Sequence, residues 1–148
     1  PEHLPFGAIG LNTESRMTST LPEERIEIAK QAWEAVSTAD VESLARVSTA
    51  AVVWHASGRG VRAGTHRGRR AVMDYLASLG DDVDSLSLDL IDVLTGDLRT
   101  ALLVRLTGAR HGKQLDTQFV VLLRLEERKI AEVWSMPNDQ YLVDEFWA

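Results

Sequence analysis

The first half of the chain carries its apolar residues at helical spacing. After Thr20, apolar positions recur three or four residues apart, which places them on one face of a helix: Ile26, Ala29, Trp33 and Val36. Thr20 and Glu23 have the spacing of a capping box. Pro22 falls in the first turn, where its missing N–H does no harm. We therefore predict a helix that begins at Thr20.

Three further elements follow before the pattern changes. Asp40 is a suitable cap for a short helix that ends near Val47. Ala51 to His55 is predicted to be a short strand, because its Val and Trp residues favour extended backbone and a glycine-rich stretch follows. A third helix is expected from about Arg69 to Leu79, with Gly80 as its stop.

From Ser85 onward the apolar period becomes two, or the apolar run becomes continuous. Four strands are predicted, around residues 86–90, 101–107, 119–125 and 130–136. Short turn signals separate them at Gly96-Asp97, at 111–113 and at 126–129, so consecutive strands should form an antiparallel meander. A phase slip after Leu90 indicates a β-bulge.

Helices first and strands last predict an α+β fold, in which three N-terminal helices pack on a strongly curved, mostly antiparallel sheet that encloses an apolar pocket. At 148 residues with 45% hydrophobic side chains, the chain has the size of one domain that buries its own core. Residues 1–16 show neither period, so we expect a leader there that is disordered, tag-derived or a docking arm, and a native start at Met17. Residues 17–148 are then the single domain.

The composition excludes several function classes. The net charge of −6 disfavours nucleic acid as a partner. No apolar run is long enough to cross a bilayer and no signal segment is evident, so no membrane partner and a cytoplasmic location are expected. Without cysteine there are no disulfides or thiolate sites. The histidines show no ligand spacing, so no metal site is expected. No nucleotide-binding motif is present, and no cofactor is expected.

Three local patterns add a family resemblance. They are the run Val53-Trp54-His55-Ala56-Ser57-Gly58, the run Ala63-Gly64-Thr65-His66-Arg67-Gly68-Arg69, and the C-terminal Asp139-Gln140-Tyr141 with Asp144-Glu145-Phe146-Trp147. With the order of elements, these resemble the SnoaL-like group of the NTF2-like superfamily, which includes ketosteroid isomerases and polyketide cyclases. The resemblance covers about residues 22–148 and implies a cone-shaped fold with a cavity.

The resemblance places His55 where the isomerases carry their general base, nine residues before Gly64. A histidine there could transfer a proton between two carbons of a bound substrate. The isomerases' oxyanion donors are not carried over, because their positions fall near Trp33 and Val121. Since strand neighbours alternate, Trp54 and His55 cannot both face the pocket without a bulge.

The expected ligand-binding residues combine aromatic walls with polar anchors: Trp33, Trp54, Tyr75, Arg105, Phe119, Val121, Trp134 and Met136. Arg105 either pairs with Asp116 on the neighbouring strand or faces the cavity and selects a carbonyl or anionic ligand. Trp134 is either core or a pocket wall. Asp139 is expected to cap the C-terminal turn rather than close the pocket mouth.

The sequence thus predicts a protein that binds an apolar small molecule, with an isomerase or cyclase acting on a ring-containing substrate through His55 as one form of that function. The alternative is a non-catalytic ligand-binding or assembly module. A homodimer is expected in either case, because relatives pair through the outer face of the sheet. A cavity filled by Trp54, Phe119 and Trp134 would favour the alternative.

Overall fold

A computed structural model describes residues 20–148 of the chain; the predicted leader at 1–16 and the start at Met17 lie outside them. Within 20–148 the elements are helix α2 (Pro22–Ser37), helix α3 (Val41–Arg46), strands β1 (Ser48–Ala56) and β2 (Gly64–Arg67), helix α4 (Arg69–Ser78), strands β3 (Ser85–Thr95), β4 (Thr100–Arg110), β5 (Lys113–Glu126) and β6 (Lys129–Pro137), and helix α5 (Gln140–Trp147).

The six strands form one sheet in the order β2-β1-β6-β5-β4-β3. Strands β3 to β6 make the antiparallel meander expected from the sequence, and β1 adds to β6 in parallel. The bulge expected after Leu90 is confirmed, since the register between β3 and β4 shifts between Leu90 and Asp92. The irregularity helps the long strands to bend.

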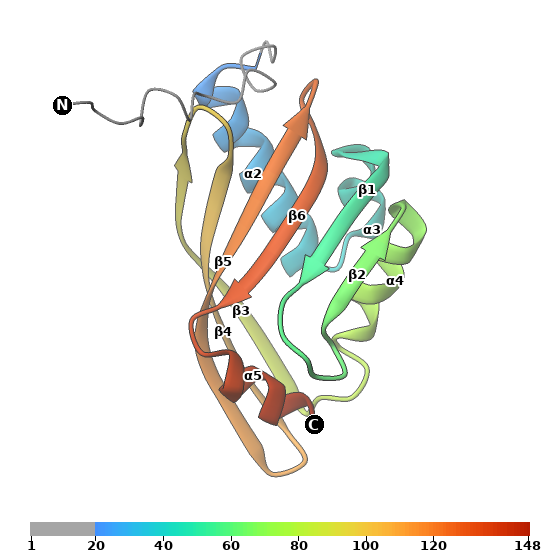
Figure 1. Cartoon of the computed structure of the whole chain (residues 1–148), viewed down its shortest axis with the longest axis vertical. Helices are drawn as coiled ribbons and strands as arrows, with labels where there is room; N and C mark the ends of the chain where they lie inside the picture. Colours follow the sequence, from blue (N-terminus) through green and yellow to red (C-terminus); the bar gives the residue numbers. More distant parts are fainter. Residues whose placement is uncertain (1–19) are drawn as a thin grey trace, which may run out of the picture.

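The helices lie on the concave side of the curved sheet, with α5 crossing one end of it next to the end of β6 (Figure 1). Helix α2 packs on β3 and β4, α4 packs on β1, and α5 packs on β5 and β6. The predicted α+β class and curved sheet are confirmed. No helix of residues 20–148 combines the length and the hydropathy that a membrane span requires.

The C-terminal segment is a full helix, where the sequence predicted only a turn after three N-terminal helices. Asp139 caps it as expected, with Oδ1 accepting from the Leu142 N–H at 3.1 Å. Phe146 is 1% exposed and Trp147 6%, and both pack against Leu115 of β5. Each such side chain contributes about 1.5–3 kcal/mol by leaving water, which fixes α5 on the sheet.

One local prediction is wrong, and one strand was not predicted. The residue before the first helix turn is Leu21, with no side-chain cap, so Thr20 and Glu23 do not form a capping box; Pro22 does occupy the first turn. The glycine-rich stretch contains β2, an edge strand of four residues that pairs only with β1. Its short length and polar composition concealed it from an apolar-period search.

Arg25 performs the anchoring that the capping box was expected to provide. Its side chain is 8% exposed and donates to the Thr20 carbonyl at 2.6 Å, the Gly96 carbonyl at 2.9 Å and Thr95 Oγ1 at 3.0 Å. Because Thr95 ends the edge strand β3 and Gly96 begins the turn that follows it, one guanidinium joins the start of α2 to the far edge of the sheet.

Replacing Arg25 by methionine should therefore destabilise the fold by about 2 kcal/mol, because three hydrogen bonds from a charged group are lost. Urea unfolding followed by circular dichroism measures the change. Lys30→Met, at an exposed position of the same helix, should stay within about 0.5 kcal/mol of wild type. Equal midpoints for Arg25→Met and Lys30→Met would disprove the anchoring role.

Candidate functional site

A cavity of about 530 Å³ lies between the concave face of the sheet and the helices. Its wall combines residues from α2, α4, α5, the four meander strands, β1 and the connection between β1 and β2. The cavity is not filled by Trp54 and Phe119, although both side chains line it. The arrangement that would have favoured a purely structural role is therefore not present.

Five of the residues expected to bind a ligand line this cavity: Trp33, Trp54, Tyr75, Phe119 and Val121. They come from four separate elements, α2, β1, α4 and β5. The Trp54 indole N–H donates to Ser135 Oγ at 3.2 Å, which fixes the ring across the β1 and β6 pair. Trp54 therefore offers a ligand its ring face rather than its N–H.

The other four expected site residues do not line the cavity: His55, Arg105, Trp134 and Met136. The reason is strand alternation, since successive side chains point to opposite faces of the sheet. With Trp54 on the concave face, His55 lies on the convex face; Ser135 likewise faces inward and its neighbours Trp134 and Met136 outward. The structure therefore places these four residues outside the cavity wall.

On the convex face, His55 is part of a polar and aromatic cluster. Its Nε2 lies 2.6 Å from Glu132 Oε2, its Nδ1 lies 3.1 Å from Thr65 Oγ1, and its ring stacks on Trp134 at 5.5 Å between centroids. Burial raises the pKa of Glu132, but hydrogen bonds from His55 and Arg124 outweigh burial and hold it below its usual value.

The ion pair that was one of the two alternatives for Arg105 is confirmed. Its guanidinium donates two hydrogen bonds to Asp116, at 2.7 and 2.9 Å.

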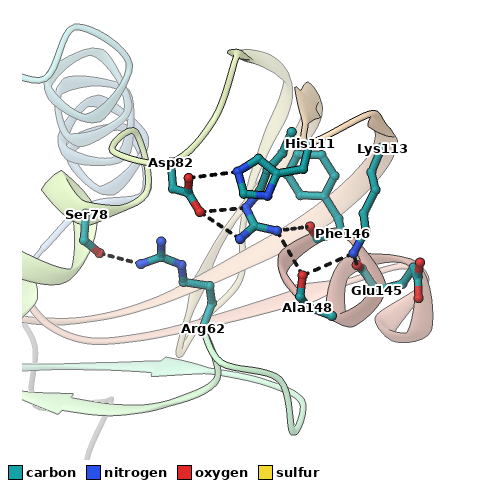
Figure 2. Close-up of polar contacts among 9 residues, drawn as sticks. Arg62, Ser78, Asp82, His111, Lys113, Glu145, Phe146 and Ala148 are labelled. Carbon is teal, nitrogen blue, oxygen red and sulfur yellow. Dashed lines mark hydrogen bonds and ion pairs between the residues drawn. The ribbon is translucent and has the colours of Figure 1, made fainter.

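One end of the cavity carries hydrogen-bond donors. Arg62, from the connection between β1 and β2, donates to Ser78 Oγ at 3.0 Å, and its guanidinium lies 4.9 Å from the Trp147 ring centroid. Figure 2 shows Arg62 reaching from that connection toward Ser78 of α4. Such a cation on an aromatic face is held in place without losing its remaining donors.

Tyr75 of α4 lines the same cavity and is held from both sides. Its ring stacks on His66 at 4.1 Å and meets Trp54 at 6.2 Å between centroids. Burial raises the pKa of Tyr75 to about 12, and the nearby charge of Arg62 lowers it by less. The phenol therefore stays protonated and can donate a hydrogen bond near neutral pH.

A second polar group comes from α5. Gln140 accepts from Ser57 Oγ at 2.6 Å and donates to Asp144 Oδ1 at 2.9 Å, and all three residues line the cavity. The loop after β1 approaches α5 so closely that a Cβ on Gly58 would clash with the Gln140 side chain, and Gly58 has a φ of +104°. Glycine meets both demands.

Helix α5 is in turn held by basic residues of the hairpin between β4 and β5 (Figure 2). Arg110 donates to the backbone oxygens of Phe146 at 3.1 Å and Ala148 at 3.0 Å, while Lys113 donates to that of Glu145 at 2.8 Å. Asp82 pairs with Arg110 at 2.8 Å, and this hydrogen bond holds the pKa of Asp82 below its usual value. These contacts hold the C-terminal end of α5, and with it Trp147, in place.

The sequence pattern did not predict the residues at the polar end of the cavity: Arg62, Ser135, Gln140, Asp144 and Trp147. Arg62 lies in a glycine-rich stretch that showed no period. For α5 a signal was present, because Val143, Phe146 and Trp147 follow the Asp139 cap at helical spacing and are the buried residues of that helix. No local signal in the sequence indicated that the two segments meet.

Known proteins share the domain family and the fold of this chain. The model of the SnoaL-like domain matches residues 29–133. Bal32a from a soil-derived mobile gene cassette is 26% identical, with a TM-score of 0.82 over 86% of this chain and 98% of that chain. A protein of unknown function with a cystatin-like fold from Xanthomonas campestris is 30% identical, with a TM-score of 0.78 over 84% and 98%.

An NTF2-like protein from Burkholderia xenovorans LB400, at 18% identity and a TM-score of 0.75 over 86% of this chain and 98% of that chain, shares the fold. The NTF2-like architecture expected from the sequence is thereby confirmed. Comparison with curated protein sequences gives no match.

The burial of the His66 ring against Tyr75 predicts that the stability of the fold depends on pH. Burial lowers the pKa of His66 from 6.5, and its Nε2 is buried without a hydrogen-bond partner among the described residues. Below pH 6.5 the unfolded chain therefore binds the proton more readily than the folded one. The stability contributed by neutral His66 is complete above that pH and is lost as the pH falls through the folded-state pKa.

His66→Phe keeps a stacked ring that cannot be protonated, so its unfolding free energy should fall less steeply than that of wild type between about pH 6.5 and 5, above the range where carboxylates titrate. Urea unfolding at several pH values measures both slopes. Parallel slopes would contradict the role of His66.

Proposed function

This chain belongs to the SnoaL-like domain family, and we propose that its cavity binds an apolar, ring-containing small molecule. The observation that supports the proposal is the cavity itself, about 530 Å³ in volume. That volume lies within the range of small-molecule sites, which are lined mostly by apolar and aromatic side chains with a few polar groups.

The aromatic residues of the wall favour a ring-containing ligand. Trp33, Trp54, Tyr75, Phe119 and Trp147 all line the cavity, and flat side chains pack best on flat ligand faces. Aliphatic residues of the meander strands complete the wall, among them Val104, Leu106 and Val121. We assign ligand contact to these residues and not to Arg105, Trp134 or Met136.

The proposal is binding rather than catalysis by His55. Proton transfer requires a base within hydrogen-bond reach of the reacting atom, and His55 lies across the sheet from the cavity, where Glu132 and Thr65 occupy its two ring nitrogens. An isomerase or cyclase activity in this cavity would need a base from the concave face. Asp144 is the carboxylate from α5 that lines it.

Neighbouring residues of β1 provide a matched test. Trp54→Leu should weaken the binding of 2-acetylnaphthalene by about tenfold, because a ring face is lost from the wall. His55→Leu, one residue away on the convex face, should leave the affinity within about twofold of wild type. Equilibrium dialysis measures both dissociation constants.

Phe119→Leu on β5 repeats this test on another wall, in case Trp54→Leu does not fold. Equal weakening by Trp54→Leu and His55→Leu would place the ligand elsewhere. A wild-type protein that fails to bind 2-acetylnaphthalene would argue against the ring-binding function.

We also propose that the convex face pairs two copies of the chain. Apolar side chains are exposed on this face, with Ile91 50%, Leu94 49%, Met136 39% and Val120 37% exposed. Val120 lies opposite Met136 on β6 and opposite Leu103 on β4, which makes a row across three strands. When a second copy covers such a row, apolar surface leaves water, which stabilises the dimer.

Val120→Lys should therefore shift the protein from dimer toward monomer, because a charge in the middle of this row must be desolvated. Size-exclusion chromatography with light scattering gives the mass. Tyr141→Lys is the matched control, since Tyr141 is 89% exposed on α5. A wild-type protein that is already monomeric, or a Val120→Lys variant that remains dimeric, would refute pairing through this face.

A further inference from the structure

Arg62 is a cation at the cavity wall without a matching anion among residues 20–148. It lines the cavity and takes part in none of the ion pairs of the described residues. One of its five N–H donors is used by Ser78, and its ring contact with Trp147 uses none. A half-buried charge in this state is stabilised by any anion that reaches it.

Tyr75 supplies a second donor close to this charge. None of the hydrogen bonds of residues 20–148 involves its hydroxyl, and its pKa of about 12 keeps it protonated. Arg62 and Tyr75 meet at Ser78, whose Oγ accepts from Arg62 at 3.0 Å and donates to the Tyr75 carbonyl at 2.7 Å, and both residues line the cavity. The rings of His66 and Trp54 hold the phenol in position, and a donor fixed in advance binds an oxygen at a lower entropic cost.

The carboxylates that line the cavity already have partners. Asp40 accepts from the backbone N–H and the hydroxyl of Ser43, at 3.1 and 2.6 Å. Asp144 accepts from Gln140 at 2.9 Å. Neither forms an ion pair with Arg62, so the donors at this end of the cavity remain available to a ligand.

We propose that Arg62 and Tyr75 form a subsite that binds an ionised oxygen of the ligand, such as a carboxylate, phenolate or enolate attached to the ring system. The inference rests on the proposed ring-binding function and adds the charge of the ligand to it. The apolar wall contacts the rings of the ligand. The subsite determines the orientation of the ligand in the cavity, because its charged oxygen is neutralised only beside Arg62.

Two naphthalene probes of nearly the same shape test the subsite: 2-naphthoate, which carries a carboxylate, and neutral 2-acetylnaphthalene. Equilibrium dialysis of the full chain at neutral pH should show that wild type binds 2-naphthoate at least tenfold more tightly. Arg62→Met should weaken 2-naphthoate about tenfold to hundredfold, because charge-assisted hydrogen bonds are lost. It should leave 2-acetylnaphthalene within about threefold.

Tyr75→Phe should weaken 2-naphthoate several-fold, and Arg62→Lys should retain part of the preference because it keeps the charge. Arg70→Met is the matched control: Arg70 is exposed and does not line the cavity, so the loss of its charge should leave 2-naphthoate binding within about twofold of wild type.

The outcomes separate the two proposals. If wild type binds both probes equally, or if Arg62→Met keeps the preference for 2-naphthoate, the anion subsite is wrong while ring binding stands. If neither probe binds to wild type, the ring-binding function fails and the subsite with it.

Discussion

The parallel pairing of β1 with β6 determines which side chains meet the cavity. This contact joins the helical first half of the chain to the last strand of the meander, with Trp54 opposite Val133 and His55 opposite Trp134. A shift of one residue would exchange the two faces of β1. It would carry His55 into the cavity and turn Trp54 outward, so the chemistry of the cavity depends on this register.

Helix α5 completes the cavity and depends on the sheet for its own position. It has eight residues, too few to be a stable helix alone. The buried Phe146 and Trp147 and the donors Arg110 and Lys113 fix it against β4 and β5. Once it is fixed, Trp147 supports the guanidinium of Arg62, so residues from the middle and the end of the chain form one polar end.

The two faces of the sheet have different chemistry. The concave face holds an open cavity with aromatic walls and donors at one end, which suits a small ring-containing ligand. The convex face carries an exposed apolar row beside ion pairs such as Arg105 with Asp116, which suits contact with another copy of the chain. Because many functions share this fold, the site residues and not the fold carry the functional argument.

The sequence by itself determined the fold class, the meander with its bulge and the helix caps at Asp40 and Asp139, because these follow from local periods and short-range hydrogen bonds. Three local motifs carried the family resemblance. It also identified five residues of the cavity wall. Only the tertiary structure decided that Trp54 rather than His55 faces inward, since alternation fixes that they differ but not which one is inside. It likewise brought Arg62 next to Ser78 and Trp147, because contacts between distant segments leave no periodic trace in the chain.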